Sequence, residues 1–107
     1  MELTGKAKVD FEKWFDDTHK HTMLLWGESV ENTGFYELTD SMKYGVYVDW
    51  FDSVDICITI SHDFHASFDE DEYIVNIDGM YDSSFETRPE ARKSAITKAT
   101  ELYNNRV

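Results

Sequence analysis

The chain has 107 residues, of which 41% are apolar, and this length and composition fit one domain spanning residues 1–107. Its 22 acidic and 10 basic residues give a net charge of −12, which disfavours nucleic acid and anionic membranes as partners and favours basic protein surfaces. One cysteine, Cys57, excludes an internal disulfide, and no apolar run suits a signal peptide or a membrane span, so we expect a soluble protein of the reducing cytoplasm.

The N-terminal residues predict a helix. Apolar side chains recur there at steps of three and four residues, which indicates an amphipathic helix from about Thr4 to Thr18 with its apolar side toward the core. The residues that form this stripe are Leu3, Ala7, Phe11, Trp14 and Phe15. After it, His19 to Asn32 is expected to be a partly buried connector, and Phe35 to Leu38 a short edge strand.

The run from Tyr44 to Ile60, YGVYVDWFDSVDICITI, shows the two-residue period of a half-buried strand in each of its halves. Turn-forming residues, Asp52-Ser53, separate the halves, so the run predicts a β-hairpin. The register that keeps the apolar side chains together pairs Trp50 with Val54. The expected buried face then consists of Val46, Val48, Trp50, Ile56, Ile58 and Ile60.

The same register defines the second face of this hairpin. Asp49 falls opposite Asp55, and Tyr47 falls opposite Cys57. Two carboxylates that face each other across a ladder destabilise it by a few tenths of a kcal/mol up to about 1 kcal/mol. Either the face is solvated and tolerates this cost, or a basic partner or a cation relieves it.

The acidic charge is concentrated in the middle of the chain. Residues 21–87 contain 15 acidic residues and a single basic one, Lys43, whereas residues 88–107 contain five basic and two acidic residues. Within the acidic part, Asp69–Glu72 is a run of four carboxylates, which is either a solvated loop or the contact site for a basic partner.

The remaining elements complete the expected fold. The alternation from Tyr73 to Ile77 predicts a third strand, and residues 80–85 a fourth short strand or a loop. Thr87–Glu90 is a capping box with a proline in the first turn, so a helix begins there. We therefore expect an α+β fold: an N-terminal helix, a three- or four-stranded antiparallel sheet and a C-terminal helix, with the helices packed on one sheet face.

Three stretches carry a resemblance to a group of proteins. Phe35–Leu38, the run YGVYVDWFDSVDICI and the ending FETRPEARKSAITKATELYN resemble small uncharacterised accessory proteins of bacteriophages and prophages. The likeness covers roughly residues 35–60 and 85–104 and includes no catalytic signature. It implies a short phage gene product that works inside a bacterial host cell, and it assigns no functional residues.

Metal chemistry is a possible alternative function. Four histidines together could bind Zn²⁺: His19, His21, His62 and His65. Their spacing, however, differs from that of zinc fingers and zincins. Asp49, Asp55 and Asp63 could bind Mg²⁺ in a hydrolase or nuclease, but the predicted strands have no basic residue to neutralise a phosphate. We therefore expect no catalytic residues, no metal site and no cofactor.

An acidic surface suggests a different function. Carboxylates two residues apart on a strand lie roughly 6.6–7 Å apart, which is similar to the spacing of phosphates along a nucleic-acid strand. We expect a phage-encoded, non-enzymatic inhibitor that binds a basic bacterial defence protein handling nucleic acid, in the manner of anti-CRISPR proteins. The alternatives are a small metal-dependent hydrolase or nuclease, and a host-takeover or assembly module that binds protein through an apolar patch. The expected contact residues are Tyr47, Asp49, Asp55, Asp63, Asp69, Glu70, Asp71 and Glu72.

Overall fold

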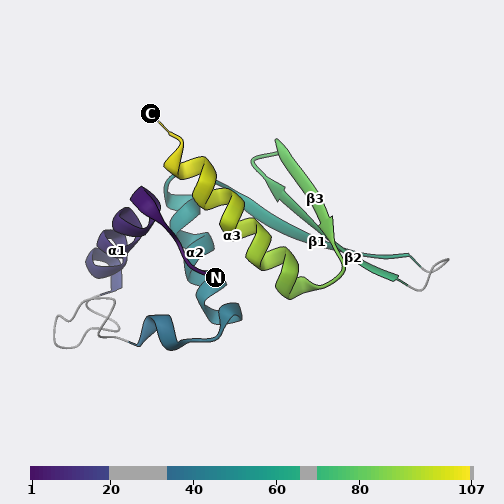
Figure 1. Ribbon diagram of the computed structural model, residues 1–107, viewed down its shortest axis with the longest axis horizontal. Helices are drawn as coiled ribbons and strands as arrows, with labels where there is room; N and C mark the ends of the chain where they lie inside the picture. The colour runs from purple at the N-terminus through teal and green to yellow at the C-terminus, as the bar shows by residue number, and fades with distance from the viewer. Residues whose placement is uncertain (20–33, 66–69, 107) are drawn as a thin grey trace.

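The computed structural model of the protein describes residues 1–19, 34–65 and 70–106 (Figure 1). The predicted connector from His19 to Asn32 lies, beyond His19 itself, outside the described residues. The elements in chain order are α1 (Gly5–His19), a 3-10 turn (Phe35–Glu37), α2 (Asp40–Ser53), β1 (Ile58–His65), β2 (Glu70–Ile77), β3 (Tyr81–Phe85) and α3 (Arg88–Asn104). Helices pack on a three-stranded antiparallel sheet, which confirms the α+β class. None of the described helices is both long and apolar enough to cross a bilayer.

Helix α2 replaces most of the predicted hairpin, so that prediction was wrong. Thr39 caps the helix, because its side-chain oxygen accepts a hydrogen bond from the backbone N–H of Met42 at 3.3 Å. Tyr47, Trp50 and Phe51 are all buried, and their spacing of three and four residues is that of one helix face. The two-residue alternation that predicted a strand arose because Val46 and Val48 flank this helix face at half-buried positions.

The aromatic side chains of α1 and α2 form the core of the helical part. Phe11 on α1 lies 5.0 Å from the ring of Tyr47 and 5.8 Å from that of Trp50. Phe35 lies 5.5 Å from Phe11, and it belongs to a 3-10 turn rather than to the predicted edge strand. Such ring pairs add about 0.5–1.5 kcal/mol each beyond their burial. The predicted N-terminal helix and its inward stripe are therefore confirmed.

The sheet has the strand order β1-β2-β3, with both pairs antiparallel. The turn between β2 and β3 has positive φ at both Asp78 and Gly79, +56° and +73°, and the N–H of Met80 donates to the carbonyl of Ile77. These are the features of a type I′ turn, for which Asp-Gly is a favoured pair. The strand predicted at Tyr73–Ile77 is confirmed, and residues 81–85 form a strand rather than a loop.

Helix α3 lies against one face of the sheet, here called the inner face. Its start is fixed as predicted, because the Thr87 hydroxyl oxygen accepts a hydrogen bond from the N–H of Glu90 at 3.3 Å. The helix buries small side chains, which allows a close approach to the strands beneath. Its buried residues are Ala91, Ala95, Ile96, Ala99, Thr100 and Tyr103.

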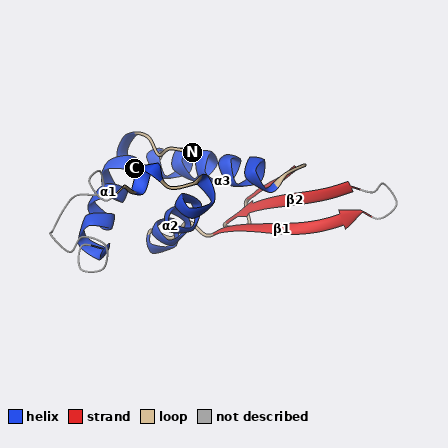
Figure 2. Ribbon diagram, turned by 90° about the horizontal axis from the view of Figure 1, so that it is seen from below, coloured by secondary structure: helices blue, strands red, loops and turns tan. Residues whose placement is uncertain are grey.

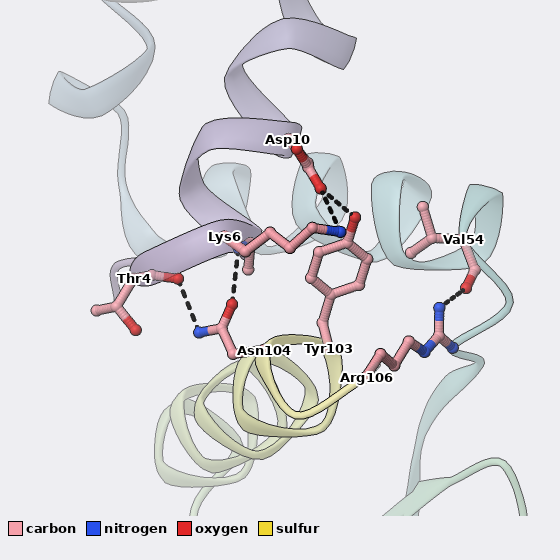
Figure 3. Close-up of polar contacts among 8 residues, drawn as sticks. Thr4, Lys6, Asp10, Val54, Tyr103, Asn104 and Arg106 are labelled. Atoms are coloured by element: carbon pink, nitrogen blue, oxygen red, sulfur yellow. Dashed lines mark hydrogen bonds and ion pairs between the residues drawn. The ribbon is translucent and has the colours of Figure 1, made fainter.

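Side chains near the end of α3 connect it to α1 and to the end of α2 (Figure 3). Asn104 acts as a cap for α1: its Oδ1 accepts from the N–H of Ala7 at 2.7 Å, and its Nδ2 donates to the carbonyl of Thr4 at 2.9 Å. Arg106 donates to the carbonyl of Val54 at 2.6 Å. All of these contacts lie at one end of the molecule. The strands β1 and β2 extend at the opposite end, away from α1 and α2.

The molecule is elongated because the paired strands β1 and β2 extend beyond α3 (Figure 2). Its principal dimensions are 54 × 31 × 18 Å. Exposure rises along the inner face of β1, from Ile58, which is 6% exposed, to Phe64, which is 56% exposed. The far part of the β1–β2 pair is therefore accessible on both of its faces.

Candidate protein-binding surface

Four carboxylates share the face of the sheet that points away from α3, here called the acidic face. Val75 and Ile77 point toward α3 and are buried, so the residues that alternate with them point outward. The register places Asp63 of β1 directly opposite Glu72 of β2, and His65 opposite Glu70. Asp82 of β3 lies opposite Asn76 on the same face. The acidic face is thus made of Asp63, Glu70, Glu72 and Asp82.

The acidic face has no lysine or arginine on its own strands. Between Ile58 and Glu86 the sequence has eight carboxylates and no basic residue other than two histidines. Two cations of α3 lie over rings of the inner face: the guanidinium of Arg88 is 4.9 Å from the ring of Tyr73, and the ammonium of Lys98 is 5.4 Å from that of Tyr81. The four carboxylates of the acidic face therefore lie on one side of the sheet, and Arg88 and Lys98 of α3 lie on the other.

The inner face carries a different cluster where it emerges from under α3. His62 stacks on Tyr73, with the ring centroids 4.7 Å apart and the planes 11° from parallel. Nε2 of His62 lies 2.7 Å from Oδ1 of Asp71, which becomes an ion pair when the imidazole is protonated. Asp71 is therefore on the opposite side of the sheet from the other carboxylates, next to the exposed Phe64.

The structure brings together only part of the predicted contact set. Asp63, Glu70 and Glu72 share the acidic face, whereas Asp71 faces the other way, and Asp69 lies outside the described residues. Asp82 was missed, because the sequence left a short strand and a loop as alternatives for residues 80–85. Two signals in the sequence could have placed Asp82 on this face. The alternation from Ile58 to Phe64 indicates a strand there, and the Asp78-Gly79 turn indicates that another strand follows the one ending at Ile77.

Three predicted contact residues lie elsewhere. Tyr47 is 0% exposed in the core of the helical part, so its predicted place on an exposed face is wrong. Asp49 is exposed on α2, and Asp55 follows α2 with a φ of +66°. The predicted pairing of Asp49 with Asp55 is therefore not formed, and the like-charge pair in the sheet is Asp63 with Glu72.

The candidate metal ligands lie apart wherever the structure describes their side chains. Within residues 1–19, 34–65 and 70–106, no three His, Cys, Asp or Glu side chains are close enough to share a metal ion. Asp49, Asp55 and Asp63 belong to α2, the loop after it and β1, so the proposed magnesium cluster is not assembled. The side chains of His19, His21 and His65 lie outside the described part of the chain.

The core tyrosines show how burial acts on titratable groups. Burial raises the pKa of Tyr47 above its ordinary value of 10.0. Burial also raises the pKa of Tyr36, and the hydrogen bond that its hydroxyl donates to Glu12 adds to the effect. In both side chains, burial therefore disfavours the charged phenolate.

No family model matches the chain, and no curated protein or solved structure is significantly similar to it. The resemblance to phage proteins therefore stays a prediction, and the function is argued from the geometry of the surface.

Proposed function

We propose that this chain is a non-enzymatic binding protein whose acidic face covers a basic surface of another protein. The observation that carries the proposal is the acidic face itself: Asp63, Glu70, Glu72 and Asp82 lie together on a sheet whose strands contain no lysine or arginine. The β1–β2 pair extends beyond the helices, so a partner can reach this face without meeting α1 or α2 (Figure 2).

The geometry suits a surface that normally binds nucleic acid. Glu70 and Glu72 are two residues apart on β2, which separates them by roughly 6.6–6.8 Å along the strand. Regularly spaced anions on a rigid strand can occupy the sites of successive phosphates, and the net charge of −12 steers a basic partner toward them. Such attraction is screened by salt, with a Debye length of about 8 Å at physiological ionic strength.

The proposed target follows from this chemistry and from the resemblance to phage proteins. A phage product with a nucleic-acid-like anionic face would act in the bacterial cytoplasm on a defence protein that handles nucleic acid. By filling the basic channel of that protein it would exclude the nucleic acid, in the manner of an anti-CRISPR inhibitor. No catalytic residue and no cofactor take part in this action.

The test is a pull-down from bacterial lysate with the tagged full chain at low and high salt, followed by identification of the bound proteins. We expect a basic nucleic-acid-binding protein that is released by salt. Recovery of no specific partner at either salt concentration would contradict the proposal.

Matched charge variants then locate the contact. One variant neutralises three of the four carboxylates of the acidic face with Asp63→Asn, Glu70→Gln and Glu72→Gln. Its control removes the same charge elsewhere with Asp49→Asn, Asp52→Asn and Asp55→Asn. Exposed ion pairs contribute about 0.2–1 kcal/mol each, so the first variant should bind roughly 3- to 150-fold more weakly and with less salt dependence. Equal losses in the two variants would show that overall charge, not the acidic face, drives binding.

A further inference from the structure

Within residues 1–19, 34–65 and 70–106, no strand lies beside the outer edge of β1. The order β1-β2-β3 leaves β1 hydrogen-bonded on one side only. In an antiparallel pair, every second residue directs its N–H and C=O to the neighbouring strand, and the residues between direct theirs the other way. The register therefore determines which backbone groups of β1 are available to a new strand.

Two hydrogen bonds at the start of β1 fix this alternation. The N–H of Asp78 donates to the carbonyl of Cys57 at 2.9 Å, and the N–H of Cys57 donates to Oδ1 of Asp78 at 2.8 Å. Cys57 thus directs its backbone toward β2, and so do the alternate residues that follow it. The backbone groups that point to the open edge belong to Ile58, Ile60, His62 and Phe64.

Over the eight residues of β1, the open edge lacks several of the features that usually prevent strand addition. Natural edge strands are protected by lysines, prolines, bulges or short length. β1 has eight residues, ITISHDFH, with neither lysine nor proline, and it pairs with β2 without interruption. Among the described residues, no backbone hydrogen bond outside the sheet involves Ile60, His62 or Phe64.

The two faces beside this edge would contact a new strand in different ways. On one face it would meet Asp63, with Glu72 one strand further. On the other face it would meet Phe64, which is 56% exposed, and the half-buried Ile60. A strand that suits both faces alternates basic and apolar side chains.

We infer that the open edge of β1 binds an extended segment of the partner by strand addition, and that this segment alternates lysine or arginine with apolar residues. The inference rests on the proposed function, because it takes the basic partner as given and specifies how the partner binds. A second copy of this chain is disfavoured, since each copy carries a charge of −12 and β1 has no basic residue except histidine. Backbone hydrogen bonds would supply affinity, and the alternating side chains would supply specificity.

The test uses a synthetic eight-residue peptide of alternating lysine and valine, with an alternating glutamate–valine peptide as its control. The readout is amide hydrogen exchange of the full-length protein by NMR. With the lysine peptide at ten times its Kd, exchange at Ile60, His62 and Phe64 should slow about tenfold. Ser61 and Asp63, whose amides already bond to β2, should change little. Binding without this alternating pattern, or equal protection by both peptides, would overturn the inference.

A pair of variants at one position separates the edge from its side chains. His62→Pro removes an outward N–H and leaves the bonds to β2 intact, whereas His62→Ala loses the same side chain but keeps the N–H. We expect His62→Ala to bind the lysine peptide and His62→Pro to lose at least tenfold in affinity. If His62→Pro does not fold, the exchange pattern of the unmodified protein decides the question alone.

The same experiments distinguish this inference from the proposed function. If His62→Pro and His62→Ala bind equally, strand addition is wrong, while the acidic face can still account for binding. If neutralising Asp63, Glu70 and Glu72 has no effect on the captured partner, the proposed function fails. Protection of the edge amides in the free protein, together with a dimer in sedimentation, would show that a second copy occupies the edge and would overturn the inferred partner.

Discussion

Replacing Tyr47 by phenylalanine should stabilise the protein. The Tyr47 side chain is 0% exposed, and within the described part of the chain its hydroxyl oxygen has no hydrogen-bond partner. A buried polar group without a partner costs about 1–3 kcal/mol, whereas the ring itself packs against Phe11 and Phe35. Tyr47→Phe removes the hydroxyl and keeps the ring, so we expect a gain of about 1–2 kcal/mol. For a domain of this size that corresponds to a rise in Tm of roughly 4–16 °C.

The assay is urea unfolding followed by far-UV circular dichroism, with Tyr36→Phe as the matched control. The hydroxyl of Tyr36 donates to Glu12 at 2.9 Å, so this second deletion should destabilise by about 0.5–1.5 kcal/mol, the opposite sign. A loss of stability in Tyr47→Phe would refute the reasoning, because it would mean that the hydroxyl makes a favourable bond.

The pH dependence provides an independent check on Tyr47. Burial disfavours the phenolate and so raises the pKa of Tyr47 in the folded state. This residue therefore leaves the stability unchanged below the ordinary pKa of 10.0, and it lowers the stability as the pH rises from there toward the folded-state pKa. The unmodified protein should therefore lose stability above pH 10 more steeply than Tyr47→Phe does. Parallel profiles for the two proteins would contradict the assignment.

Two further predictions concern the contacts at the end of α3. Asn104→Ala removes both hydrogen bonds to the start of α1 and should destabilise by about 1–3 kcal/mol in urea unfolding, whereas Asn105→Ala, at the exposed neighbouring position, should stay within about 0.5 kcal/mol of the unmodified protein. The hydrogen bond from Tyr103, helped by Lys6, lowers the pKa of Asp10 below its ordinary value of 3.8, so the stability it gives is present above that pH and lost as the pH falls through the lower folded-state pKa. Tyr103→Phe should flatten the acid limb of the stability profile, and an unchanged acid limb would disprove the role of this bond.

The terminal helices and the strand at Tyr73–Ile77 were determined by the sequence itself. The stripe from Leu3 to Phe15 and the capping box at Thr87 depend on residues close together in the chain. The turn at Asp78-Gly79 does as well, because its backbone conformation suits those two residues. Local signals of this kind act before any tertiary contact forms, so they can be read without the fold.

The secondary structure of residues 40–53 was decided by tertiary packing. The run from Tyr44 to Trp50 satisfies a two-residue period and a helical one, and propensity does not separate them. The helix is more stable than the strand here, because it directs Tyr47, Trp50 and Phe51 into one core. Phe11 and Tyr103 complete that core. These partners are distant in sequence, so the choice between the two periods was made by packing.

The candidate surface shows the same division. The sequence alone determined that the centre of the chain is strongly acidic and that residues 58–86 contain no lysine or arginine. Only the strand register decided that Asp63, Glu70, Glu72 and Asp82 share one face, while Asp71 turns to the other side and pairs with His62. A shift of one residue in a strand moves every side chain to the opposite face, so charge content could be predicted from the sequence and charge position could not.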